Sequence, residues 1–208
     1  MVRMNKLTPD EIETVNTYNK HAKAWISEHN DDDFYVQEYQ NFNKLLPVGK
    51  ILEIGCGAGR DAQKLIAQGY EYVGTDVAEK LLESSRKRIP QAKFKRVDVY
   101  SLNFKEKFDG FWCAAVLLHI PRNRITEALS SISSQIKSGG VGFISTKQGT
   151  SNMLEALPYD ASSKRLQVHY TKKEFDNALF VSGFEIVSYN FRPLSERSKW
   201  MCYFVRKI

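Results

Sequence analysis

The chain has 208 residues, a net charge of +6 and three cysteines, a length that suits one domain over residues 1–208 with a substantial core. An odd number of cysteines without metal-ligand spacing argues against a disulfide framework and for a reducing compartment. There is no signal peptide and no apolar run of about eighteen residues, so we expect a cytoplasmic protein without a membrane segment.

The N-terminal region is predicted to be helical. Residues 8–11 read Thr-Pro-Asp-Glu, the usual order of an N-cap, a proline at the first helical position and acids in the first turn. We expect one helix to about residue 28 and a second over about 33–46. The aspartates at 31–33 lack the alternating ligands and turn glycine of a calcium loop, so a loop role and no metal site are predicted. Residues 1–46 would then form a helical cap.

Residues 51–61, Ile-Leu-Glu-Ile-Gly-Cys-Gly-Ala-Gly-Arg-Asp, are the most informative stretch. A short apolar strand carrying Glu53 leads into three glycines, and apolar residues at helical spacing follow to Gln68. Glycines suit this turn because it visits positive φ and lets a ligand approach bare backbone. One strand later comes Asp76, about twenty residues past the first glycine, where a carboxylate can accept both hydroxyls of a ribose. The pattern therefore predicts a nucleoside site.

The glycine spacing decides which family of nucleoside sites this is. A dinucleotide fingerprint needs a glycine where the chain has Arg60, and no Gly-Lys-Ser/Thr follows to make a P-loop. The alternative is an ordinary glycine turn that binds nothing. Such a turn would not be expected to have the preceding strand, the following helix and Asp76 all in the places that a nucleoside site requires. The E-x-G-x-G-x-G pattern of residues 53–59 resembles motif I of the class I S-adenosylmethionine-dependent methyltransferases. The resemblance implies S-adenosylmethionine as cofactor, with its methionine part at the glycines.

Strands and helices alternate through the middle of the chain, which predicts a parallel sheet with helices on both faces. A capping box at 171–174 opens a later helix to about residue 182. Two final strands, about 184–191 and 199–205, are joined by too few residues for a parallel crossover and must form a hairpin. The earlier strands are expected near 50–55, 71–75, 93–97, 108–114 and 140–146, and the helices near 60–68, 79–88 and 122–137.

This layout resembles the class I methyltransferase core over residues 47–208. The resemblance implies an α/β, Rossmann-like, doubly wound seven-stranded sheet in the order 3-2-1-4-5-7-6, with strand 7 antiparallel. Asp98 and Val99 resemble the third-strand motif that meets adenine, although Asp98 could also be a turn former. The cofactor contacts implied are Glu53, Gly55, Cys56, Gly57, Gly59, Arg60, Asp76, Val77, Asp98, Val99, Cys113 and Ala114.

The end of the fourth strand bears on the methyl acceptor. Residues 114–121 contain neither the Asn/Asp-Pro-Pro-Tyr/Phe of amino-methylating enzymes nor the Pro-Cys of cytosine-C5 enzymes, and Cys113 is expected to be inert. The segment resembles bacterial type 11/12 small-molecule methyltransferases. His119, with an ordinary pKa near 6.5, could act as base toward an alcohol or carboxyl group. Alternatively, it packs at a helix start, since alignment supplies much of the catalysis of a direct displacement.

Substrate recognition is expected outside the shared sheet. The longest connection, 148–170, is predicted to be a lid, and its arginine together with that of the terminal hairpin would favour an acidic small molecule. Each candidate could instead be a packing or surface residue. The candidate substrate contacts are Tyr18, Trp25, His119, Arg165, Tyr170 and Arg192.

Two other functions remain open on the sequence. The basic residues between 80 and 96 would suit an RNA methyltransferase, whose affinity comes from phosphates. We favour a solvated helix face there, because interleaved aromatic residues for base stacking are lacking, and we expect no nucleic-acid partner. A non-catalytic S-adenosylmethionine-binding protein is the second alternative. The sequence does not indicate the oligomeric state.

Overall fold

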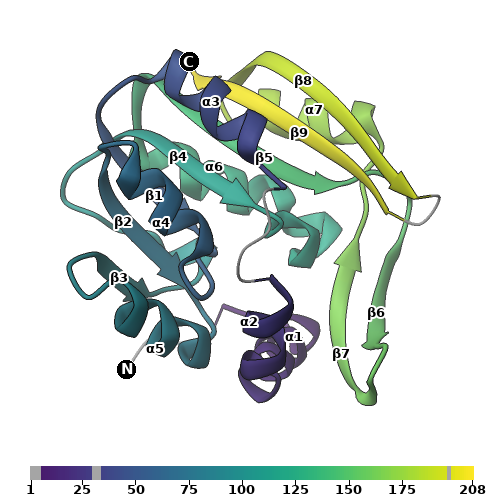
Figure 1. Ribbon diagram of the computed structural model, residues 1–208. Coiled ribbons are helices and arrows are strands. Elements are labelled where there is room, and N and C mark those ends of the chain that lie inside the picture. Colours follow the sequence, from purple (N-terminus) through teal and green to yellow (C-terminus); the bar gives the residue numbers. More distant parts are fainter. Residues whose placement is uncertain (1–5, 30–33, 196–197) are drawn as a thin grey trace.

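The computed structural model describes residues 6–29, 34–195 and 198–208, which are built around a seven-stranded sheet (Figure 1). Its strand order is β3-β2-β1-β4-β5-β9-β8. The first five strands are parallel, and β9 is antiparallel to both of its neighbours. The predicted fold class and strand order are confirmed, the two final strands being β8 and β9. The strands are β1 (Lys50–Ile54), β2 (Glu71–Asp76), β3 (Lys93–Arg96), β4 (Phe108–Ala114), β5 (Ile136–Lys147), β8 (Phe184–Ser195) and β9 (Ser198–Lys207).

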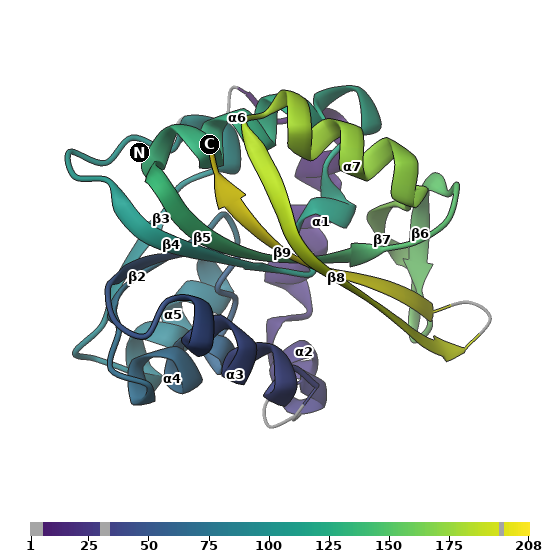
Figure 2. The ribbon, with the colours of Figure 1, turned by 90° about the horizontal axis from the view of Figure 1, so that it is seen from above.

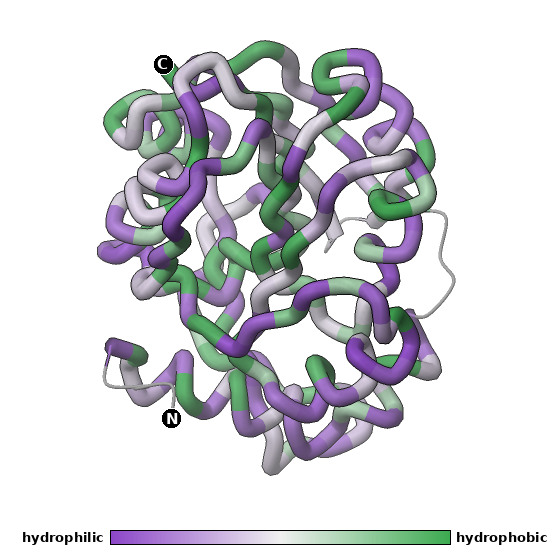
Figure 3. The backbone as a smooth tube through the Cα atoms, turned by 90° about the vertical axis from the view of Figure 1, so that its left-hand side faces the viewer, coloured by the Kyte–Doolittle hydropathy of each residue, from purple (hydrophilic) through white to green (hydrophobic). Residues whose placement is uncertain are grey.

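Helices cover both faces of this sheet (Figure 2). α6 (Ile125–Gln135) and α7 (Lys172–Val181) lie on one face. α3 (Val36–Leu45), α4 (Arg60–Ala67) and α5 (Glu79–Arg88) lie on the other. Most residues of β1, β2, β4 and β5 are buried or half-buried, as expected for strands covered on both faces. Hydrophobic segments run through the middle of the molecule, and many hydrophilic ones lie around them (Figure 3).

Two N-terminal helices lie across the end of the sheet, α1 (Pro9–Lys20) and α2 (Ala22–His29). The capping box of α1 forms as predicted, with Thr8 and Glu11 bonded to each other's backbone. The prediction of one continuous helix to about residue 28 is wrong in one respect. The helix is interrupted at His21, which ends α1 with non-helical backbone angles (φ −105°, ψ 19°). The chain then continues as α2. The aspartates at 31–33 lie outside the described residues.

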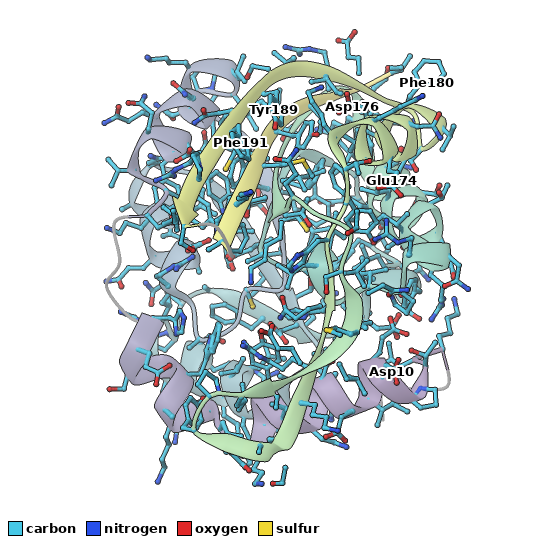
Figure 4. All side chains as sticks on the ribbon, turned by 90° about the vertical axis from the view of Figure 1, so that its right-hand side faces the viewer. Asp10, Glu174, Asp176, Phe180, Tyr189 and Phe191 are labelled. Carbon is cyan, nitrogen blue, oxygen red and sulfur yellow. The ribbon has the colours of Figure 1, made fainter. Side chains whose placement is uncertain are left out.

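The connection predicted as a lid loop contains a β-hairpin, β6 (Asn152–Leu157) and β7 (Asp160–Val168), which forms a separate two-stranded sheet. It runs from the main sheet down to α1 (Figure 4). α1 packs along the edge of β7: Leu166 N donates to Thr14 Oγ1 at 2.8 Å, and Thr17 Oγ1 donates to the Lys164 carbonyl at 2.7 Å. Side chains of α1 thus take the place of a neighbouring strand.

One further boundary differs from the prediction. α6 ends at Gln135 and β5 begins at Ile136, whereas the sequence predicts a helix to about 137 and a strand from about 140. Ile136 pairs with Phe108 of β4 before a register shift, so pairing across the sheet draws these residues into the strand. Within the described ranges, no helix is long and apolar enough to cross a membrane.

Candidate functional site

A cavity of about 450 Å³ opens where the parallel strands end. This is the edge at which α/β sheets bind ligands. Its floor comes from the ends of β1, β2 and β4 and from the turn after β3, and its roof comes from α1 and α2. The terminal hairpin closes one side through Leu194, Ser198 and Trp200. The other roof and wall residues are Leu7, Glu11, Thr14, Val15, Tyr18, Trp25, Ile26, His29, Phe34 and Tyr35.

The glycine turn after β1 shapes the floor. Gly55, Gly57 and Gly59 have φ values of +69°, +51° and +84°, a region in which side chains are strained. A Cβ on Gly55 would lie 2.2 Å from Val116 Cγ2, so this glycine is needed for packing. A Cβ on Gly57 would meet no described atom within 4 Å. Gly57 therefore leaves an open cradle beside the cavity.

Two carboxylates stand at the ends of neighbouring strands. Asp76 Oδ2 accepts from Gly57 N and its Oδ1 from Ala78 N, both at 2.8 Å. Burial nevertheless raises the pKa of Asp76, against the lowering effect of these hydrogen bonds. Asp98 is 1% exposed; its Oδ1 accepts from Tyr100 N at 2.9 Å, while its buried Oδ2 has no partner among the described residues. A buried oxygen left open beside a cavity fits a ligand N–H.

A third acid, Glu53, is buried beneath the glycine turn. It is 2% exposed and accepts a short hydrogen bond from the Tyr72 hydroxyl. Burial, and then the charge of Asp61, raise the pKa of Glu53 well above its usual range. Asp61 in turn accepts from Trp112 Nε1 at 2.8 Å and from Arg60 Nε at 2.5 Å. These contacts hold Arg60 at the margin of the cavity, which it lines.

His119 lies in the segment after β4 and lines the same cavity. Its Nδ1 is 2.6 Å from the Leu166 carbonyl oxygen, which can only accept, so Nδ1 carries the hydrogen. Its Nε2 then accepts from the Tyr18 hydroxyl at 2.9 Å. Burial lowers the pKa of His119 to about 3, assisted by the charges of Arg165 and Lys147 and opposed by the bond to Leu166. The imidazole is therefore neutral at physiological pH.

The structure brings most of the sequence-predicted site residues together around this one cavity. Gly59 instead caps α4, and Cys113 is fully buried within β4. Arg165 lies behind Tyr18, to whose hydroxyl it donates at 3.3 Å. The predicted residues that line the cavity are Tyr18, Trp25, Glu53, Gly55, Cys56, Gly57, Arg60, Asp76, Val77, Asp98, Val99, Ala114 and His119.

Two predicted substrate contacts are engaged elsewhere. Tyr170 is 1% exposed and packs against Phe175. Arg192 Nη1 lies 3.1 Å from the carboxylate of buried Glu38 and 2.5 Å from the Phe34 carbonyl oxygen. The Arg192 charge thus compensates a buried acid on α3.

Some cavity residues were not predicted from the sequence. Glu11 and Tyr100 meet through a 2.5 Å hydrogen bond between the Tyr100 hydroxyl and Glu11 Oε1, and Phe34 and Tyr35 line the side near the terminal hairpin. The capping box predicts where α1 begins, but it does not indicate which face of the helix covers the cavity.

The basic residues between 80 and 96 are partly paired with acids of α5. Arg86 lies 2.6 Å from Glu79, and Lys80 lies 2.9 Å from Glu83.

Over the described ranges, no group of three or more histidine, cysteine or acidic side chains could hold a metal ion.

Residues 51–140 match the family model of a methyltransferase domain. This segment holds the glycine turn, Asp76, Asp98 and His119, which all line the cavity. Residues 51–140 are therefore a methyltransferase domain. The resemblance seen in the sequence is therefore confirmed.

Known relatives of this methyltransferase domain come from several bacteria. The probable S-adenosyl-L-methionine-dependent methyltransferase TehB of Haemophilus influenzae is 24% identical over 138 residues, or 64% of this chain and 48% of that protein. The chain thus spans about half the length of this relative. The ubiquinone biosynthesis O-methyltransferase of Histophilus somni is 26% identical over 160 residues, or 69% of this chain and 65% of that protein.

A solved structure shares the fold of the methyltransferase domain and its flanking elements. It is the 1,6-didemethyltoxoflavin-N1-methyltransferase of Burkholderia thailandensis, with a TM-score of 0.75 and 19% identity, covering 97% of this chain and 91% of that one. At this identity the match shows a common architecture.

Proposed function

We propose that the chain is an S-adenosylmethionine-dependent methyltransferase that acts on an acidic small molecule. One observation carries the proposal: a single cavity joins an open glycine cradle to Asp76 and to the unpartnered oxygen of Asp98. The cradle at Gly57 suits the amino-acid part of a ligand, Asp76 suits a ribose, and Asp98 suits an adenine. S-adenosylmethionine has these three parts and supplies an activated methyl group.

Each of these parts has a partner of suitable chemistry. Asp98 Oδ2 would accept from the adenine amino group, which satisfies the buried oxygen without disturbing the bond from Tyr100. Asp76 would accept from the ribose hydroxyls, since each carboxylate oxygen has lone pairs beyond those used by Gly57 and Ala78. Arg60 would offer a cation to the carboxylate of the methionine part.

The acceptor is proposed to be small because α1, α2 and the terminal hairpin enclose the cavity. The names of relatives support this size class, since they include a trans-aconitate 2-methyltransferase and a ubiquinone biosynthesis O-methyltransferase. The Arg165 guanidinium at this end favours an acidic molecule. Residues 1–46 would act as the cap of a core at 47–208. Three free, buried cysteines support a reducing, cytoplasmic setting.

The proposed catalysis relies on placement more than on proton removal. A neutral His119 that already donates to Leu166 and accepts from Tyr18 holds the Tyr18 hydroxyl at the cavity wall. Direct displacement gains most from fixing the reacting groups in line, and the roof of α1 and α2 excludes water from them.

Calorimetric titration with S-adenosylhomocysteine tests the proposal. We expect the wild-type chain to bind, and Asp76→Asn to weaken binding by roughly 10- to 100-fold, because hydrogen bonds to a charged group contribute about 1.5–3 kcal/mol each. Asp10→Asn is the matched control, since Asp10 is exposed on α1 (Figure 4). The absence of wild-type binding, or equal affinities for the wild type and Asp76→Asn, would contradict the cofactor assignment.

A further inference from the structure

Two cations lie directly behind the aromatic wall at the acceptor end of the cavity. The Arg165 guanidinium carbon is 5.6 Å from the ring centre of Tyr18 and 5.2 Å from that of Trp25. Lys147 Nζ is 5.8 Å from the ring centre of Trp200. All three rings line the cavity. The two cations come from different elements, β7 and β5, and lie behind different rings of the cavity wall.

Gln167 connects the positions of these two cations. Lys147 Nζ lies 3.4 Å from Gln167 Oε1, and Gln167 follows Arg165 by two residues on β7. Alternate residues of a strand point to the same face about 6.6 Å apart. Lys147 Nζ therefore lies beside the residue that adjoins Arg165 along one face of β7. Burial lowers the pKa of Lys147, the charge of Glu155 raises it and the charge of Arg165 lowers it.

Neither cation has a salt-bridge partner within the described part of the chain, although the charge of Glu155 acts on Lys147. Lys147 and Arg165 form no salt bridge there, and Arg165 Nε is buried with no hydrogen-bond partner in that part. Glu155 is the cross-strand neighbour of Arg165 but is exposed. Half-buried like charges repel each other and lose hydration, and both costs fall when an anion joins them. His119, held neutral, adds no charge of its own.

We propose that Lys147 and Arg165 jointly bind a carboxylate of the methyl acceptor, and that the acceptor is a planar, unsaturated acid whose apolar part lies against Trp25 and Trp200. The free Arg165 Nε and the Lys147 ammonium supply charge-assisted donors, and the two indole rings supply flat apolar walls. This inference rests on the proposed function and adds the acceptor class and Lys147, a specificity-determining residue.

The subsite can be tested before the natural acceptor is known. Benzoate serves as the probe and benzamide as its uncharged counterpart, each titrated into the protein saturated with S-adenosylhomocysteine. Tryptophan fluorescence is the readout, because Trp25 and Trp200 lie beside the cations, and calorimetry provides an independent measure. We expect benzoate to bind at least roughly tenfold more tightly than benzamide, as loss of a charged hydrogen bond implies.

Three substitutions assign the binding to these residues. Lys147→Met and Arg165→Met should each weaken benzoate binding roughly tenfold or more, whereas Lys147→Arg should retain it. Lys164→Met is the matched control, since Lys164 is an exposed lysine next to Arg165 on β7. Melting temperatures confirm that each variant is folded. The affinity for S-adenosylhomocysteine should be the same in all of them.

The outcomes separate this inference from the proposed function. If the wild type binds S-adenosylhomocysteine but shows no preference for benzoate over benzamide, the subsite is wrong and the cofactor assignment stands. If folded Lys147→Met and Arg165→Met proteins bind benzoate as tightly as the wild type does, the subsite is also wrong. Failure of the wild type to bind S-adenosylhomocysteine overturns the proposed function itself and this inference with it.

Discussion

The Tyr18 hydroxyl donates to His119 Nε2 at 2.9 Å and so joins α1 to the turn that follows β4. The direction of this bond follows from the other side of the ring, where Nδ1 must donate to the Leu166 carbonyl oxygen. Arg165 also donates to the Tyr18 oxygen, at 3.3 Å. With its hydrogen committed to His119, the Tyr18 hydroxyl can offer only a lone pair to an incoming molecule.

The low pKa of His119 predicts how stability depends on pH. The imidazole titrates near 6.5 when unfolded and at about 3 when folded, so between these values the unfolded chain binds more protons. The free energy of unfolding should therefore fall as the pH drops from 7 to 5, by about 2 kcal/mol from this group. His119→Gln, which can keep both hydrogen bonds without titrating, should lack this component. Urea denaturation at both pH values measures it, and identical losses in the two proteins would exclude it.

Asp98→Asn should change which nucleoside binds. The asparagine oxygen can keep the bond from Tyr100 N, while its amide nitrogen replaces the open oxygen and faces the adenine amino group as a second donor. We expect a roughly 10- to 100-fold loss of S-adenosylhomocysteine affinity and a relative gain for S-inosylhomocysteine, whose base presents an oxygen there. Calorimetry with both compounds measures the switch. Parallel losses for the two ligands would argue against contact with Asp98.

Two glycines of one turn should respond differently to alanine. Gly55→Ala combines a φ of +69° with a Cβ 2.2 Å from Val116, so it should lower the free energy of unfolding by the strain plus a further 1–3 kcal/mol or so of overpacking. Gly57→Ala has a φ of +51° and no described neighbour for its Cβ, and should cost only about 1–2 kcal/mol. Its methyl group should instead reduce S-adenosylhomocysteine affinity. Thermal melts and titrations separate the two effects, and full ligand affinity in Gly57→Ala would contradict the cradle.

Removing the hydroxyls that bind the edge of β7 should loosen the hairpin. Thr14→Val leaves Leu166 N without its acceptor, and Thr17→Val leaves the Lys164 carbonyl without its donor. Each unsatisfied group costs about 1–3 kcal/mol. Hydrogen exchange should therefore accelerate over residues 152–168 in the double variant while the strands of the main sheet stay protected. Unchanged exchange in the hairpin would mean that α1 does not hold it.

The central sheet could be predicted because its signals are local. The strand, glycine turn and helix around Gly55 are contiguous, and a helix that follows a buried strand dictates a parallel neighbour. The alternation therefore predicts that Asp76 and Asp98 follow successive strands, and the resemblance implies that these strands are neighbours; both residues line the cavity.

The β6–β7 hairpin could not be predicted because its stabilising partners are remote. Leu166 bonds to Thr14, 152 residues away in sequence, and no alternation within 152–168 announces such a contact. Arg192 illustrates the same limit, because its partner Glu38 is 154 residues distant. Long-range partners of this kind decide whether a charged side chain faces a ligand or a buried acid.

One helix, α1, contacts two separate parts of the cavity wall. Glu11 of α1 meets Tyr100 beside Asp98, and Tyr18 of the same helix meets His119 after β4. A movement of α1 would therefore open the adenine side and the His119 side of the cavity together. Release of the used cofactor and binding of a new cofactor or acceptor would then depend on the same movement. A substitution that slows the movement of α1 would slow both release and binding.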